Sequence, residues 1–221
     1  MTIQTLRLPL GPLQTNCYVL ACTTTGQAAV IDPAWDGRAI AKAVENQGWV
    51  LSHILLTHAH FDHVGGLGEL KEISDAPIYI HPEAVPMLER APAAAAMWGF
   101  AVEPPPPADV LLTGHETLQI GEITISVLFT PGHAPGHVCF YAANEDVVFD
   151  GDVLFQNSIG RTDLPGGDYD LLMQSIHQQL MPLPDNTLVL SGHGPATTIG
   201  DERQNNPFLT QGTARSSSAG A

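Results

Sequence analysis

Three histidines and an aspartate lie within six consecutive positions, at His58, His60, Asp62 and His63. The apolar residues 54–56 precede them and predict a β-strand that ends here. Alternate residues of an extended chain share a face, so His58 and His60 can bind one metal ion together. Asp62 and His63 follow where the chain turns toward a helix, and they can face a second ion. A single histidine is more often a polar residue at a strand end, but the whole HxHxDH group predicts a metal centre.

Three later residues occupy similar positions in the second half of the chain: His133, Asp152 and His193. Each follows an apolar segment that predicts a strand, and each comes directly after a glycine. Glycine permits the tight turn that would bring such a side chain beside a metal ion. Each of these segments is weak evidence alone, but together with HxHxDH they provide seven candidate ligands.

The HxHxDH segment and the three later loops, in this order, resemble the motifs of the metallo-β-lactamase superfamily. The resemblance covers nearly the whole chain and is greatest to the small glyoxalase II-like (hydroxyacylglutathione hydrolase-type) members. It implies an α/β fold, a four-layer αββα sandwich in which two mixed β-sheets are flanked by helices. It also implies the ligand sets of two ions, with His58, His60 and His133 on one, Asp62, His63 and His193 on the other, and Asp152 bridging them.

Imidazole and carboxylate ligands without cysteine suit Zn²⁺, Fe²⁺ or Mn²⁺, and we favour two zinc ions. Metal binding can lower the pKa of water to about 7, so the expected nucleophile is a metal-bridging hydroxide. Asp62 is the candidate catalytic residue, as the one evident acid near the ions. True β-lactamases of the superfamily usually have Cys or Ser at the bridging position, so Asp152 argues against antibiotic hydrolysis.

The expected substrate is a small-molecule thioester, because a thiolate with a thiol pKa near 8.5 leaves without a strong acid. The resemblance favours hydrolysis of S-lactoylglutathione or a related acyl-glutathione. A mononuclear-iron persulfide dioxygenase and a lactonase are the alternatives. Such dioxygenases tend to have Cys at the position of His137, so His137 favours hydrolysis. Larger glyoxalase II enzymes have a C-terminal helical domain for glutathione, whereas little ordered chain is expected after His193.

Four further residues have expected roles around the metal centre. Asp32 ends a predicted strand, where it could cap the helix predicted over residues 37–46, whereas the resemblance implies that it supports the ligands. His137 lies in a loop that enters a strand, and we expect it to support the ligands without binding metal. Asp150 should form hydrogen bonds at its strand end. Arg161 is the candidate substrate-binding residue, although an ion pair with Asp163 suits its position equally well.

The composition limits the possible partners. The 221 residues include 23 acidic and 8 basic ones, and the net charge of −15 disfavours binding to nucleic acid or to anionic membranes. No long apolar run or export signal is present, and the three cysteines show no CxxC spacing. We therefore expect a cytoplasmic protein, either a monomer or a homodimer.

Hydrophobic patterns predict one domain over residues 1–209. Strands are expected over residues 3–8, 16–21, 28–31, 50–56, 77–80, 122–129, 138–142, 146–149 and 187–190, and helices over 37–47, 68–74 and 170–180. Residues 210–221 are rich in Ser, Gly and Ala and should form a disordered tail.

Residues 82–107 separate the two halves of the candidate metal site, and we expect them to form a flap over it. Short helical turns are predicted within 82–90 and 93–96, followed by an extended run of four prolines at 104–107. Met97, Trp98 and Phe100 could line a pocket, but such clusters more often belong to the core.

Overall fold

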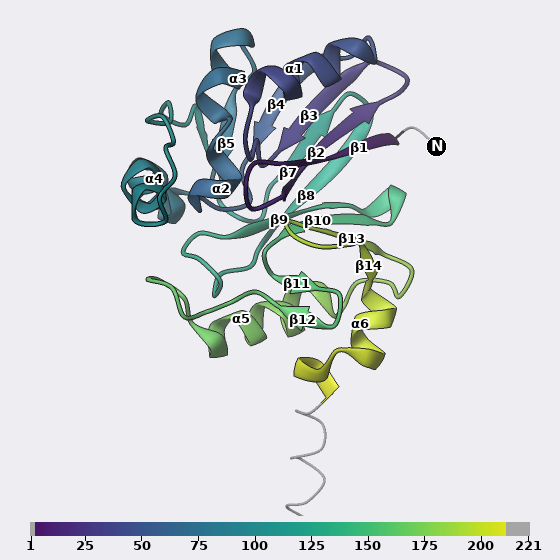
Figure 1. The fold of residues 1–221 in the computed structure, drawn as a ribbon. Helices are drawn as coiled ribbons and strands as arrows, with labels where there is room; N and C mark the ends of the chain where they lie inside the picture. The colour runs from purple at the N-terminus through teal and green to yellow at the C-terminus, as the bar shows by residue number, and fades with distance from the viewer. Residues whose placement is uncertain (1–2, 211–221) are drawn as a thin grey trace, which may run out of the picture.

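Two mixed β-sheets pack face to face in the computed structural model, which describes residues 3–210 (Figure 1). The first sheet contains, in spatial order, β1 (Ile3–Leu10), β2 (Thr15–Cys22), β3 (Gln27–Ile31), β4 (Val50–Leu55), β5 (Ile78–Ile80) and β6 (Val110–Leu111). Neighbours are antiparallel from β1 to β3 and parallel from β3 to β6.

The second sheet has the spatial order β14 (Thr197–Thr198), β13 (Leu188–Ser191), β10 (Val147–Gly151), β9 (Val138–Ala142), β8 (Ile123–Phe129) and β7 (Thr117–Ile120). Only the pairing of β10 with β13 is parallel in this described sheet. A separate hairpin consists of β11 (Leu154–Phe155) and β12 (Ser158–Ile159).

Helices cover the outer faces of both sheets, which confirms the predicted four-layer sandwich. The helices α1 (Gly37–Asn46) and α3 (Leu67–Ile73) lie outside the first sheet (Figure 1). Outside the second lie α5 (Tyr169–Ser175), which continues as a π-helix over Ile176–Leu180, and α6 (Ile199–Asn205). The short α2 (Phe61–Val64) and α4 (Val85–Met97) lie beside the first sheet and contact each other. No helix in residues 3–210 is long and apolar enough to cross a membrane.

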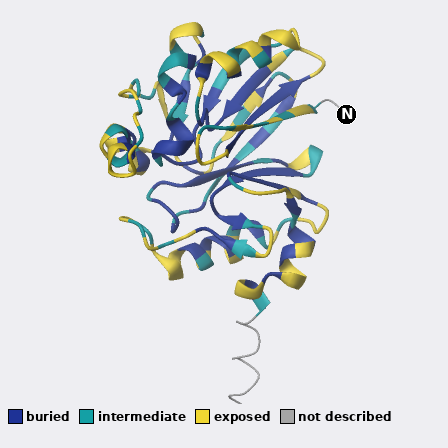
Figure 2. Cartoon of the chain, viewed as in Figure 1, coloured by how far each residue is buried: buried dark blue, intermediate teal, exposed yellow. Residues whose placement is uncertain are grey.

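The sequence of β2 shows why the layers form. Every residue of this strand is buried, so both of its faces need apolar partners (Figure 2). Cys17, Val19 and Ala21 face the helix layer, whereas Tyr18 and Leu20 pack between the two sheets. Successive side chains of a strand point to opposite faces of the sheet. When both faces are covered, the strand is mostly apolar along its length and shows no alternation of polar and apolar residues.

Two segments differ from their predictions. The separate turns expected after residue 82 are a short 3₁₀ turn and one helix, α4, which continues through Pro92. The helix continues through this proline because four alanines follow it and Leu88, Ala91 and Ala95 are buried against the core. The chain after His193 is also more ordered than predicted, since it forms β14 and α6. Residues 211–221 of the predicted tail lie outside the described part.

Helix α1 gives a test of local stability. The Asp36 side chain accepts a hydrogen bond from the Ala39 amide at 3.0 Å, and Asp36 has φ of 48°. We expect Asp36→Ala to reduce the free energy of unfolding by about 1–2 kcal/mol, because it removes the cap and alanine tolerates this conformation poorly. Asp36→Asn is the matched control and should stay near the wild type, as measured by urea unfolding. Equal losses in both variants would contradict this role.

Candidate metal centre

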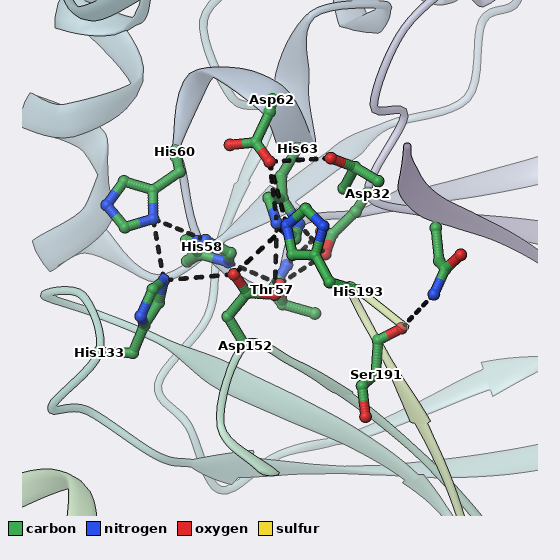
Figure 3. A network of polar contacts seen from close by, with 12 residues as sticks. Asp32, Thr57, His58, His60, Asp62, His63, His133, Asp152, Ser191 and His193 are labelled. Carbon is green, nitrogen blue, oxygen red and sulfur yellow. Dashed lines mark hydrogen bonds and ion pairs between the residues drawn. The ribbon is translucent and has the colours of Figure 1, made fainter. Parts of the chain in front are cut away.

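The predicted ligands meet at one end of the sandwich, where strands of both sheets run into loops (Figure 3). The chain beyond β4 carries His58 and His60, and α2 carries Asp62 and His63. Loops after β8, β10 and β13 supply the ligands of the second sheet, which are His133, Asp152 and His193. The structure therefore brings all seven candidate ligands together.

The first group consists of three imidazoles. His60 Nδ1 lies 3.0 Å from His58 Nε2 and 2.9 Å from His133 Nε2. Nitrogen ligands at the usual zinc distance of about 2.0–2.1 Å must lie within roughly 4 Å of one another. These contacts satisfy that condition, and the three residues can hold one ion.

The second group consists of Asp62, His63 and His193, whose candidate ligand atoms lie within 4.8 Å of one another. Asp62 Oδ2 is 3.2 Å from His193 Nε2 and 3.7 Å from His63 Nε2. Carboxylate and imidazole donors at this separation suit a second divalent ion.

Asp152 lies between the two groups. Its Oδ1 is 3.4 Å from His63 Nε2, and its Oδ2 is 3.6 Å from the Nε2 atoms of both His133 and His193. His63 Nε2 and Asp152 Oδ1 are buried and have no hydrogen-bond partner among the described residues. Buried polar atoms normally have partners, so these two atoms fit a centre whose remaining partner is a metal ion.

Asp32 supports the centre from behind. Its carboxylate accepts bonds from the Thr57 amide at 2.8 Å, the Thr57 hydroxyl at 2.6 Å and His63 Nδ1 at 2.9 Å. The last bond directs Nε2 of His63 into the centre, as is usual for a histidine that binds metal. The alternative role as a helix cap is wrong, because Asp36 caps α1.

His137 and Asp150 hold the turn that carries Asp152. His137 is fully buried, its Nδ1 lies 3.0 Å from Thr130 Oγ1, and its Nε2 accepts a bond from the Asp152 amide at 3.2 Å. Asp150 accepts a bond from the Leu154 amide at 2.8 Å across the same turn. With both of its ring nitrogens occupied, His137 supports the bridging residue and leaves metal binding to its neighbours.

Arg161 contributes to the site through its backbone. Its carbonyl oxygen accepts a bond of 2.8 Å from His133 Nδ1, which directs Nε2 of that histidine toward His60. Its guanidinium forms two bonds with Asp163, of 2.7 and 2.8 Å. The structure thus shows the ion pair between Arg161 and Asp163, one of the two roles that the sequence left open for Arg161. The Arg161 side chain is half exposed.

Burial keeps the first group neutral. It lowers the pKa of His60 to about 4 and the pKa of His58 well below its ordinary value. Burial also lowers the pKa of His133. Neutral imidazole is the form that binds a metal, so these residues are ready to bind at neutral pH.

The second group attracts positive charge. Burial acts to lower the pKa of His63, but the carboxylates of Asp152 and Asp62 outweigh it and raise that pKa well above its ordinary value. The pKa of His193 is raised in the same way, against burial, by its bond to Asp62 and the charge of Asp152. Burial acts to raise the pKa of Asp62, yet His63 and His193 lower it to about 2. Asp62 is therefore a carboxylate at neutral pH, which suits a ligand and not the acid that the sequence suggested.

Sequence reasoning missed two residues that complete the centre. The Thr15 hydroxyl donates to Asp62 Oδ2 at 2.8 Å, and the Asn16 side chain binds the loop that carries His193. The glycine before His193, Gly192, was part of the prediction, and a side chain there would collide with Asp152 and His63. Thr15 and Asn16 are buried polar residues at the start of an otherwise apolar strand, which was the only signal available in the sequence.

The 82–107 segment packs against the helix that carries Asp62 and His63. Phe100 lies 5.9 Å from Phe61 and 6.3 Å from Trp35 between ring centroids, and it packs against the core. This confirms the core role for Phe100, whereas Met97 and Trp98 are largely exposed. The role of the whole segment as a flap stays a prediction.

The family model of the metallo-β-lactamase superfamily matches residues 10–193, a span that contains all seven ligand positions. The chain belongs to this superfamily. Among curated proteins, it is 45% identical to a probable metallo-hydrolase, YqgX, of Bacillus subtilis over 92% of this chain and 96% of the relative. It is 38% identical to the hydroxyacylglutathione hydrolase GloC of Haemophilus influenzae, over 91% of this chain and 96% of the relative.

Two solved structures of superfamily members are also similar. The BLEG-1 B3 metallo-β-lactamase is 47% identical, with a TM-score of 0.88 over 94% of this chain and 100% of the other. TTHA1623 in a di-iron-bound form is 42% identical, with a TM-score of 0.83 over 92% of this chain and 100% of the other. The chain therefore has the scaffold of the metallo-β-lactamase superfamily, with a His and Asp cluster that suits divalent metal ions.

The pKa shifts predict how metal binding depends on pH. In the metal-free protein, the carboxylates of Asp152 and Asp62 raise the pKa of His63 and His193, so protons compete with a metal ion for these rings. We expect the dissociation constant for Zn²⁺ to decrease as pH rises from about 6 to about 8. Titration against a chromophoric chelator at several pH values measures this change. Calorimetry in two buffers that differ in ionisation enthalpy would count the released protons, and finding none would contradict the assignment.

Proposed function

We propose that this protein is a binuclear metal-dependent thioester hydrolase, with glyoxalase II-like hydrolysis of S-lactoylglutathione or a related acyl-glutathione as its reaction. The observation that carries the proposal is the position of Asp152 between two groups of three ligands. Two bound divalent ions, zinc by preference, supply an activated water and positive charge for the acyl oxygen.

The residues around the centre favour a thiolate leaving group. His58, His60 and His133 have lowered pKa values, so they are neutral imidazoles and not general acids. Asp62 is ionised, and its bond from Thr15 holds one oxygen in place. Without a strong acid among these residues, a thiolate leaves more readily than an alkoxide or an amide nitrogen, because the pKa of a thiol is about 8.5.

The similarity to the hydroxyacylglutathione hydrolase GloC supports the glutathione thioester. The similarity to the BLEG-1 B3 metallo-β-lactamase makes β-lactam hydrolysis the second candidate, in spite of the Asp at position 152. Both reactions need attack by water on a carbonyl carbon, so one metal centre can serve either. The choice between them lies in the leaving group and in the contacts that hold the rest of the substrate.

A substrate panel on the metal-loaded protein tests the proposal. We expect two metals per chain by elemental analysis and faster hydrolysis of S-lactoylglutathione than of a lactone or a β-lactam. Asp152→Ala should lose both metal and activity, because it removes a ligand of both ions, while the exposed Asp75→Ala should keep both. A single iron per chain with oxygen uptake on glutathione persulfide would instead identify a persulfide dioxygenase.

Arg161 is the proposed anchor for the substrate carboxylate, since its backbone bonds the ligand His133 and its side chain is exposed. An exposed ion pair contributes little stability, so a substrate carboxylate could replace Asp163. We expect Arg161→Ala to raise KM for glutathione thioesters with little change in kcat, and to leave a small uncharged thioester unaffected. Asp163→Asn is the matched variant and should lower KM. Equal losses on both substrates, or loss of thermal stability alone, would favour a purely local ion pair.

A further inference from the structure

The loop that carries His193 is bound by side chains from the opposite sheet. Asn16 Nδ2 donates to the carbonyl oxygens of Ser191 at 2.8 Å and Gly194 at 3.1 Å, on both sides of His193. The Asn16 amide also donates to the Gly192 carbonyl at 2.7 Å. One residue at the start of β2 therefore bonds to three of the four residues from 191 to 194.

Arg7 completes this arrangement from the neighbouring strand β1. Its Nε donates to Asn16 Oδ1 at 2.8 Å, and its Nη2 donates to the Gly194 carbonyl at 2.9 Å. The first bond fixes the orientation of the Asn16 amide, because Oδ1 must face the guanidinium and Nδ2 must then face the loop. Arg7 is exposed and Asn16 is buried, so the pair joins the surface to the metal centre.

We propose that Asn16 and Arg7 are positioning residues that set the metal affinity of the second group, formed by Asp62, His63 and His193. They act by holding the His193 loop at the distance where Nε2 reaches Asp62, which is 3.2 Å away. This inference rests on the two-metal centre of the proposed function and is independent of the substrate.

The effect is confined to the second group because the other ligands are held from elsewhere. His63 is oriented by Asp32, and Asp62 accepts a bond from Thr15. The imidazoles of the first group are oriented by residues outside this pair, including the Arg161 carbonyl for His133. His193 depends more on its loop, because 33% of its side chain is exposed and it lies between two glycines.

Stepwise metal titration tests the proposal with a readout other than activity. Metal-free wild-type protein, Asn16→Ala and Arg7→Ala are titrated with Zn²⁺ against a chromophoric chelator, and Co²⁺ spectra report each site separately. We expect the variants to bind the first ion as the wild type does and the second about 10- to 100-fold more weakly, the usual effect of losing an outer partner. Arg7→Lys should resemble Arg7→Ala, since lysine lacks the fork that reaches both Asn16 and Gly194.

Arg90→Ala is the matched control, because Arg90 is also an exposed arginine and lies in α4. If both sites of the Arg7 and Asn16 variants keep wild-type affinity, or both weaken equally, the inference is overturned. Should Asn16→Ala fail to fold by circular dichroism, the exposed Arg7→Ala decides the question. If the wild-type protein binds only one ion, the proposed function and this inference are overturned together. If it binds two ions and the variants keep the wild-type affinity for the second ion, the inference alone is overturned.

Discussion

The Asp152 carboxylate between two groups of imidazoles is the interaction on which the rest of the centre depends. It lies within 3.6 Å of histidines from both groups, and it raises the pKa of His63 while burial opposes that shift. A carboxylate buried among imidazoles is stable only with a proton or a cation close by. The same requirement explains why the turn that carries Asp152 is fixed on both sides by His137 and Asp150.

The centre exists only when the two sheets are packed together. Four ligands follow β4 in the first sheet, and three follow strands of the second. Tyr18 of β2 contacts Phe149 of β10 at 5.5 Å between ring centroids, in the apolar layer that fixes the distance between the sheets. The Tyr18 hydroxyl also donates to the Ser191 carbonyl at 2.8 Å, so the same residue joins the core to the His193 loop. Packing of the core therefore determines the spacing of the ligands.

Once two divalent ions are bound, the charge at the metal centre differs in sign from the net charge of the chain. The chain has a net charge of −15, which repels an anionic substrate at long range. Two divalent ions would reverse the sign of the local potential at the ligands. The Arg7 guanidinium donates to the Gly194 carbonyl beside His193, which places a positive charge next to a metal ligand. The Arg161 carbonyl accepts a bond from His133, while the Arg161 guanidinium is paired with Asp163.

The sequence by itself determined the ligand set and the layered fold. HxHxDH places four donors within six residues, and the apolar strands before His133, Asp152 and His193 end at glycines. The order of residues within each short segment is therefore enough to identify the ligands. Asp32 was considered as a cap for the helix over residues 37–46, whereas the structure shows that Asp36 caps this helix and that Asp32 bonds His63. The partner of Arg161, the exposure of Trp98 and the roles of Thr15, Asn16 and Arg7 were decided only by the tertiary structure. Arg7 and Gly194 are 187 residues apart and meet because the sheets pack, and no local pattern encodes such a contact.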